Sequence, residues 1–315
     1  MGQILLIGLA AGAASALLAA GLSTGSVLAV PLFYLSPLPI MVAGLAFPHW
    51  AALLAVATSG LGLGLVFGGT ALLSYSLGIG GPAWILAYSA LLARPEPAAR
   101  DGKAWFSLSG LLLLGAALVS VSVSIALLSL ASDYSAYRDA IETALKIILE
   151  AGAGAPKLDL ERIAAVFAAL LPPSFAAVVM ISLMGCLYLA ARVARISGRL
   201  TRPWPALSAV RLSPVVALTF LVLTAIAFLG GMVGLLASVG VAVLLIAFCA
   251  CGFAVLHALT FGRAGRGLIL TATWMASLVL VWPVLIVAVI GLVDSVLDLR
   301  TRMRTNGGPP AANDR

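Results

Sequence analysis

The first 93 residues of the chain contain no charged side chain: no Asp, Glu, Lys or Arg occurs from Met1 to Ala93. A helix needs about 20 apolar residues to cross a bilayer, so this run has room for roughly four spans joined by short turns. The run is far too long for barrel strands of about ten alternating residues. Only 9% of all 315 residues are charged, against roughly 25% in soluble domains. The sequence therefore predicts an all-α fold, a polytopic transmembrane helical bundle.

Arginines indicate which loops face the cytoplasm. The loop that contains Arg192, Arg195, Arg199, Arg202 and Arg211 has no acidic residue, and positive loops stay inside. Counting spans from this loop places Arg94–Lys103 inside and Asp133–Pro173 outside. Two spans in Leu212–Gly262 return the chain to the inside, so a last span at Leu268–Val293 should end outside. Arg300, Arg302 and Arg304 instead indicate a cytoplasmic tail. The sequence thus predicts eight or nine spans and leaves the side of the tail open.

Residues 1–299 are predicted to form a single transmembrane domain, followed by a polar, disordered tail at 300–315. Within the domain, 133–171 forms an external insert of two amphipathic helices, because apolar residues recur there at helical spacing. The second helix is predicted to stop at Pro172-Pro173. This pair is either a passive interfacial cover or a lid over a substrate site.

The stretch from Val30 to Ile40 reads V-P-L-F-Y-L-S-P-L-P-I. Its prolines break the predicted second span, Gly25–Phe47, because each removes a backbone donor. Broken backbone at membrane depth must be covered by protein or must line a wet cavity, and interrupted spans are typical of transporter sites. Five residues are therefore candidate substrate-binding residues: Pro31, Phe33, Tyr34, Pro37 and Pro39.

Gly60, Gly64 and Gly68 recur every four residues in the predicted span Trp50–Phe67 and its C-terminal end. Such a face lets two helix backbones approach closely. These are predicted helix-packing residues, and the sequence allows either a dimer interface or tight packing within one chain.

Ionisable residues near apolar segments are functional candidates because charge is costly at membrane depth. His257 and Asp294 are added to the substrate-binding candidates on this ground. Asp294 and Asp298 are four residues apart, which indicates either a cation-linked carboxylate pair or a helix end where Asp298 pairs with Arg302. Interfacial solvation also explains His257.

Reaction motifs are missing from the sequence. It contains no H-E-x-x-H, G-x-S-x-G, P-loop or dinucleotide fingerprint, so we expect no enzymatic activity, no catalytic residue and no cofactor. Cys249 and Cys251 have no nearby His or acidic partner in the sequence, so no metal site is expected. The net charge of +7 is explained by span ends and lipid headgroups, which leaves no role for nucleic acid.

Four short motifs resemble the YybS-like predicted bacterial membrane proteins, a family whose domain has unknown function. They are P-L-F-Y-L-S-P-L-P-I-M-V-A-G at Pro31–Gly44, L-L-P-P-S-F at Leu170–Phe175, G-F-A-V-L-H at Gly252–His257 and G-L-V-D-S-V-L-D-L-R at Gly291–Arg300. That family is distantly similar to the S-components of energy-coupling-factor vitamin transporters. The resemblance implies a multi-pass protein of the bacterial inner (plasma) membrane and carries over no catalytic residue.

Two functions are compatible with these observations. One is a solute-binding or transport component that works with a transporter ATPase module. The other is a non-transporting membrane scaffold or envelope-assembly factor that binds other membrane proteins. Membrane lipids are expected partners in both cases.

Overall fold

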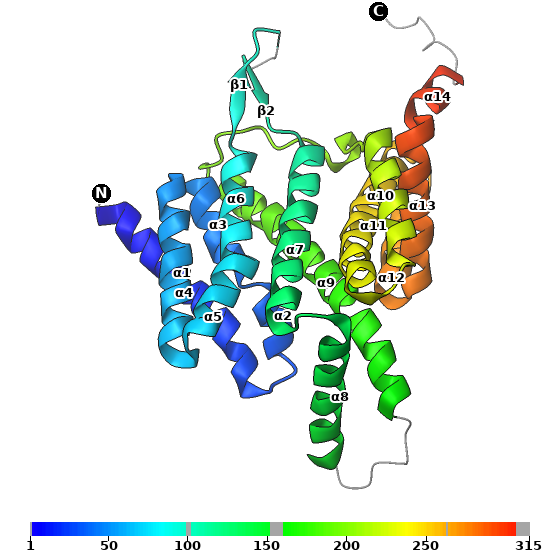
Figure 1. The fold of residues 1–315 in the computed structure, drawn as a ribbon. Coiled ribbons are helices and arrows are strands. Elements are labelled where there is room, and N and C mark those ends of the chain that lie inside the picture. Colours follow the sequence, from blue (N-terminus) through cyan, green and yellow to red (C-terminus); the bar gives the residue numbers. More distant parts are fainter. Residues whose placement is uncertain (1, 99–101, 152–159, 263, 307–315) are drawn as a thin grey trace, which may run out of the picture. The chain divides into compact units, whose positions relative to one another are not determined.

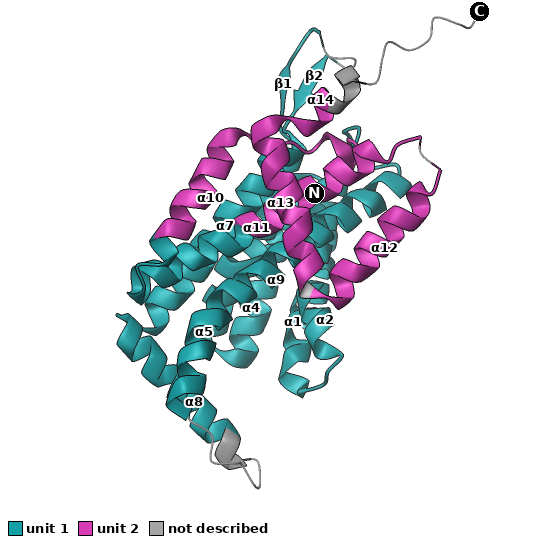
Figure 2. Ribbon diagram, turned by 90° about the vertical axis from the view of Figure 1, so that its right-hand side faces the viewer, with its two compact units in different colours: residues 1–204, 226–243 teal, residues 205–225, 244–315 magenta. Residues whose placement is uncertain are grey.

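The computed structural model describes residues 2–98, 102–151, 160–262 and 264–306. The chain divides into two compact units, which Figure 2 distinguishes by colour. Unit 1 comprises residues 1–204 and 226–243, and unit 2 comprises residues 205–225 and 244–315. The stretch predicted as a single transmembrane domain therefore contains two units, each described below by itself.

Within the described residues, seven helical segments are long and apolar enough to cross a membrane. They are Gly2–Thr24, Ala29–Ala46, His49–Phe67, Gly69–Ala90, Leu108–Leu130, Leu160–Ile196 and Gly231–Leu259. Three further helices are also apolar but shorter, at Pro214–Ala227, Arg266–Val279 and Trp282–Leu297. The predicted polytopic helical membrane bundle is confirmed.

The charge-free start of the chain builds the first half of unit 1 (Figure 1). Helix α1 (Gly2–Ala20) continues into the 3₁₀ turn η1 (Gly21–Thr24) and packs on α4 (His49–Phe67). The predicted broken span is α2 (Ala29–Tyr34) followed by α3 (Pro37–Ala46). A second interrupted segment follows, with α5 (Gly69–Tyr75), the π-helical turn η2 (Ser76–Gly80) and α6 (Gly81–Ala90).

A short hairpin and an amphipathic helix lie at opposite ends of unit 1 (Figure 1). The hairpin is formed by β1 (Ala93–Pro95) and β2 (Lys103–Trp105), which pair antiparallel. Helix α7 (Leu108–Leu130) then crosses to α8 (Tyr134–Ala151), whose buried Tyr137 lies on the apolar face. α8 packs on the first part of α9 (Leu160–Ile196).

The predicted end of the second amphipathic helix at Pro172-Pro173 is wrong, because α9 continues through both prolines. Proline removes a donor, but its fixed φ of about −65° is compatible with a helix, and neighbouring helices make proline tolerable in spans. Pro172 is buried, and α9 packs against α3, α7 and α8. The predicted external insert is therefore α8 together with the start of a long helix.

Unit 2 contains the 3₁₀ turn η3 (Leu207–Ala209) and the second half of α11 (Gly231–Leu259). It also contains α10 (Pro214–Ala227) except for the last two residues of that helix. The last predicted span, Leu268–Val293, is instead two helices, α12 (Arg266–Val279) and α13 (Val281–Leu297). Leu280 between them is extended, with φ −120° and ψ 136°, so the chain reverses there (Figure 2). An uninterrupted apolar composition concealed this reversal.

Two contacts place the end of α13 beside part of the predicted arginine loop. Arg300 donates a hydrogen bond to the carbonyl of Ser208, and Asp298 pairs with Arg211, so the end of α13 lies at the arginine-loop end of unit 2. The start of the predicted disordered tail is helical, since α14 runs over Leu299–Asn306. Residues 307–315 lie outside the described part of the chain.

Candidate functional site

The interruption between α2 and α3 changes the hydrogen bonding of one backbone carbonyl. Pro37 is the first residue of α3, a favoured place for proline because the position needs no N–H donor. The N–H of Leu38 donates to the carbonyl of Leu35 and not to that of Tyr34, four residues back. The carbonyl of Tyr34 therefore needs a partner from outside the helix.

Side chains of other helices supply the partners. The Ser182 hydroxyl of α9 donates to the Tyr34 carbonyl, and the Cys186 thiol lies 3.5 Å from it. The Ser15 hydroxyl of α1 donates to the Ser36 carbonyl at 2.7 Å. The Tyr75 hydroxyl lies 2.6 Å from Ser15 Oγ and donates to it, because the single Ser15 hydroxyl proton goes to the Ser36 carbonyl. We call Ser15, Ser36, Tyr75, Ser182 and the Tyr34 carbonyl the broken-helix cluster.

The polar groups of the broken-helix cluster form hydrogen bonds to one another, except for one hydroxyl. Ser15, Ser36 and Tyr75 are buried, and a buried polar group is costly without a partner. The two carbonyls at the interruption are paired by the protein itself. The hydroxyl of Ser36 is buried with no hydrogen-bond partner among the described residues.

The predicted substrate-binding residues of unit 1 surround this interruption. Phe33 and Tyr34 are half-buried, and their rings touch edge to face with centroids 5.5 Å apart. Pro31 is exposed, while Pro37 and Pro39 lie in the first turn of α3. Their role in binding a substrate stays a prediction.

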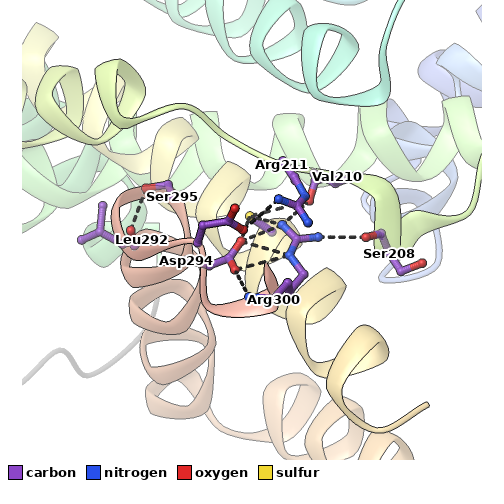
Figure 3. A network of polar contacts seen from close by, with 9 residues as sticks. Ser208, Val210, Arg211, Leu292, Asp294, Ser295 and Arg300 are labelled. Carbon is purple, nitrogen blue, oxygen red and sulfur yellow. Dashed lines mark hydrogen bonds and ion pairs between the residues drawn. The ribbon is translucent and has the colours of Figure 1, made fainter. Parts of the chain in front are cut away.

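Unit 2 contains a different polar site, an ion pair that is almost completely buried (Figure 3). Arg300 Nη2 lies 2.6 Å from Asp294 Oδ2, and the two side chains are only 4% and 3% exposed. The guanidinium also donates to the carbonyls of Ser208 and Val210, at 2.8 Å each. Its Nη2 is 3.8 Å from the sulfur of Cys251. We call Asp294, Arg300 and these three partners the ion-pair cluster.

The backbone at Asp298 creates the ion-pair cluster. Asp298 ends α13 in the left-handed region, with φ 46°, which turns the chain back and brings Arg300 against Asp294. Asp298 Oδ1 lies 2.8 Å from Nη1 of Arg211, and its pairing with Arg302 stays a prediction. A hydrogen bond from the Thr301 hydroxyl, and then the Arg211 charge, hold the pKa of Asp298 below its usual range.

His257 lies in the last turn of α11 and is half-buried. It belongs to unit 2, as does Asp294, whereas the other substrate-binding candidates belong to unit 1. Asp294 is occupied by Arg300, so its carboxylate is not free to bind a solute as the structure stands. Within the described residues, no group of three His, Cys, Asp or Glu side chains could hold a metal ion.

The glycine face of α4 packs within the chain. A Cβ at Gly60 would meet Ser76, and one at Gly64 would meet Leu72, so both glycines lie against the α5 segment. Gly68 instead ends α4 with φ 90° and open space around it. The predicted helix-packing role therefore fits Gly60 and Gly64, whereas Gly68 allows the turn that follows α4.

Several polar residues of these sites have no predictive sequence pattern. Ser15 and Ser182 stand alone among apolar residues, Tyr75 lies between two serines, and no pattern in the sequence pairs the three. Arg202, predicted only as a topology signal, is buried and donates to the carbonyls of Ala90 at 2.6 Å and Phe106 at 3.1 Å. Burial lowers the pKa of Arg202.

Together, the apolar helices and the internally paired polar clusters define a polytopic α-helical integral membrane protein. Residues 12–295 match the family model described as a predicted membrane protein, DUF2232. The chain belongs to this family, which confirms the predicted family resemblance. No curated protein and no solved structure matches the chain. The similarity to vitamin-transporter S-components therefore stays a prediction.

Proposed function

We propose that this integral membrane protein is a non-enzymatic scaffold of the bacterial inner membrane that acts by binding other membrane proteins. The observation that carries the proposal is the closure of the broken-helix cluster. Ser15 and Ser182 occupy the Ser36 and Tyr34 carbonyls, which are the groups that a transporter of this type would offer to a solute.

The surface of the α8–α9 pair supports a binding role. α8 is amphipathic and packs its Tyr137 side against α9, yet Ile147 and Ile148 are 64% and 67% exposed. Phe167 at the start of α9 is also exposed. Exposed apolar residues on a charged helix are typical of protein or membrane contacts. This pair is where we expect a partner to bind.

A solute-binding function is the second candidate, and one observation favours it. The Ser36 hydroxyl is buried without a hydrogen-bond partner among the described residues, and such groups usually have an unrecorded partner such as water or a ligand. A small polar solute at Ser36, next to the half-buried Phe33 and Tyr34, would satisfy it.

Photo-crosslinking in cells separates the two functions. A photoreactive residue at Ile148 should capture one membrane protein in a stoichiometric complex, while the same residue at Ser135, exposed on α8 away from the face of Ile147 and Ile148, should capture much less. Co-purification with an ATPase module would instead favour transport. Thermal-shift screening against vitamins and their precursors tests solute binding directly: stabilisation that is lost in Ser36→Ala would overturn the scaffold proposal.

A further inference from the structure

A groove of about 460 Å³ lies at one end of unit 1. Phe47, Pro48 and His49 line it from the connection between α3 and α4, and Tyr88 and Leu91 line it from the end of α6. Arg199 and Thr201 complete it from the segment after α9. None of the described residues that line the groove is acidic.

The groove lies at the ends of four membrane spans. One span ends at Ala46 and the next begins at His49; two others end at Ala90 and Ile196. Every lining residue is within five positions of one of these ends. Since the ends of spans lie where hydrocarbon gives way to headgroups, we expect a groove at the ends of these candidate spans to lie at the level of lipid phosphates.

The backbone after α9 directs Arg199 into the groove. Gly198 has a left-handed backbone conformation, with φ 68°, and its N–H donates to the backbone carbonyl of Arg195. The N–H of Arg199 donates to Ala194, five residues back. These two bonds form a Schellman motif, which ends the helix in one defined geometry. The Arg199 guanidinium then lies over the Phe47 ring, 4.6 Å from its centroid.

Arg199 is exposed and has no carboxylate partner among the described residues. Arg192 and Arg195, also exposed, precede it in the last turns of α9. A guanidinium presents planar donors that suit a phosphate. The positive charge of this end of α9 is thus available to an anion.

The aromatic residues at the groove have the character of a membrane interface. The ring of His49 lies 4.6 Å from that of Trp50 and 5.2 Å from that of Tyr88. Trp50 and Tyr88 are exposed, and amphipathic rings of this kind gather at headgroup level. Leu91 and Leu92 add an apolar wall beside them.

We propose that this groove binds one anionic phospholipid. Arg199 donates to the headgroup phosphate, with the Thr201 hydroxyl beside it in the lining, and the glycerol and upper acyl chain lie along Leu91 and Leu92. Basic pockets between spans bind anionic headgroups in this way. The site is independent of the proposed scaffold function.

Native mass spectrometry of the detergent-purified full chain tests this site. The protein is titrated with dioleoyl phosphatidylglycerol or with dioleoyl phosphatidylcholine. We expect one phosphatidylglycerol to be retained in preference to phosphatidylcholine. Arg199→Gln should weaken its retention about fivefold, as expected for one arginine at a membrane surface. Arg195→Gln removes the same charge one turn away, outside the groove, and should have little effect.

Three results would overturn the site: equal retention of both lipids, equal losses in Arg199→Gln and Arg195→Gln, or displacement of the lipid by millimolar inorganic phosphate. The first two indicate no site or a diffuse charge effect, and the third indicates a site for free phosphate. Phe47→Leu is a second variant, which removes the ring under the guanidinium and keeps the charge. It should weaken retention by a smaller factor, and unchanged retention in both groove variants would contradict the proposal.

Discussion

The two units stabilise buried polar groups by different means. In unit 1 the broken-helix cluster consists of neutral hydroxyls and carbonyls from α1, α2, the residues between α2 and α3, α5 and α9. In unit 2 the ion-pair cluster consists of a carboxylate and a guanidinium with carbonyls around them. Neutral groups cost little to bury once paired, whereas each buried ion costs several kcal/mol and depends on every partner. The consequences of removing one member should therefore differ sharply.

The largest effect is expected in the ion-pair cluster. Arg300→Met leaves Asp294 buried without its counter-ion and should lower the free energy of unfolding by about 3–5 kcal/mol. Reversible unfolding in mixed micelles measures this. The double variant Asp294→Leu with Arg300→Met should recover part of the loss, because no charge is left buried. A double variant less stable than either single variant would contradict the description of this pair.

Glycine contacts give the second comparison between the units. A Cβ at Gly252 would collide with the backbone carbonyl of Val287, and one at Gly291 with that of Phe248, so α11 and α13 touch through backbone. Gly252→Ala should lower the free energy of unfolding by about 2–3 kcal/mol, because a carbonyl cannot move aside. Gly60→Ala should cost less than about 1 kcal/mol, because the Ser76 hydroxyl that it meets can rotate. Equal losses would remove the difference between the two contacts.

A smaller effect is expected in the broken-helix cluster. Ser15→Ala removes the donor to the Ser36 carbonyl and the partner of Tyr75, and should lower the free energy of unfolding by about 1 kcal/mol. Ser129→Ala is the control, since among the described residues that exposed hydroxyl donates only to the carbonyl of Ala126 in its own helix. A loss of the size expected for Arg300→Met would show that neutral and charged clusters do not differ.

The smallest effect depends on pH and lies outside both clusters, at the start of α8. The N–H of Ala136 and the hydroxyl of Ser135 donate to Asp133, and these bonds lower the pKa of Asp133. Because the folded pKa is lowered, the stabilisation is present above the ordinary carboxyl pKa and is lost as pH falls through the lowered value. The protection factors of the α8 amides, which correct for the slower intrinsic exchange in acid, should therefore fall as pH falls.

Asp133→Asn controls for this pH dependence, because the amide oxygen still accepts both bonds but does not titrate there. It should keep α8 protected with a weaker dependence on pH. An identical acid response in wild type and Asp133→Asn would assign the effect to another group.

The sequence was sufficient for the class of fold and for the position of the interruption. The charge-free run predicted the crowded first spans, and the prolines of Val30–Ile40 predicted a break that the structure places between Tyr34 and Pro37. The first feature follows from composition and the second from the local stereochemistry of proline, so neither depends on contacts between distant residues.

Tertiary packing explains what the sequence could not predict. Pro172-Pro173 continues α9 because neighbouring helices hold it, and Leu280 reverses an apolar stretch that looks like one span. The partners of the broken helix lie far along the chain, such as Ser182 for Tyr34. The pairing of Asp294 with Arg300 depends on the left-handed Asp298, which no local pattern marks.

Double-mutant cycles in the two clusters test the central difference most directly. Unfolding free energies are measured for Asp294→Leu, Arg300→Met and the double variant, and likewise for Ser15→Ala, Tyr75→Phe and their double variant. The account predicts a coupling of about 3 kcal/mol for the ion pair and below about 1 kcal/mol for the hydroxyl pair. Equal couplings, or a larger one between Ser15 and Tyr75, would contradict it.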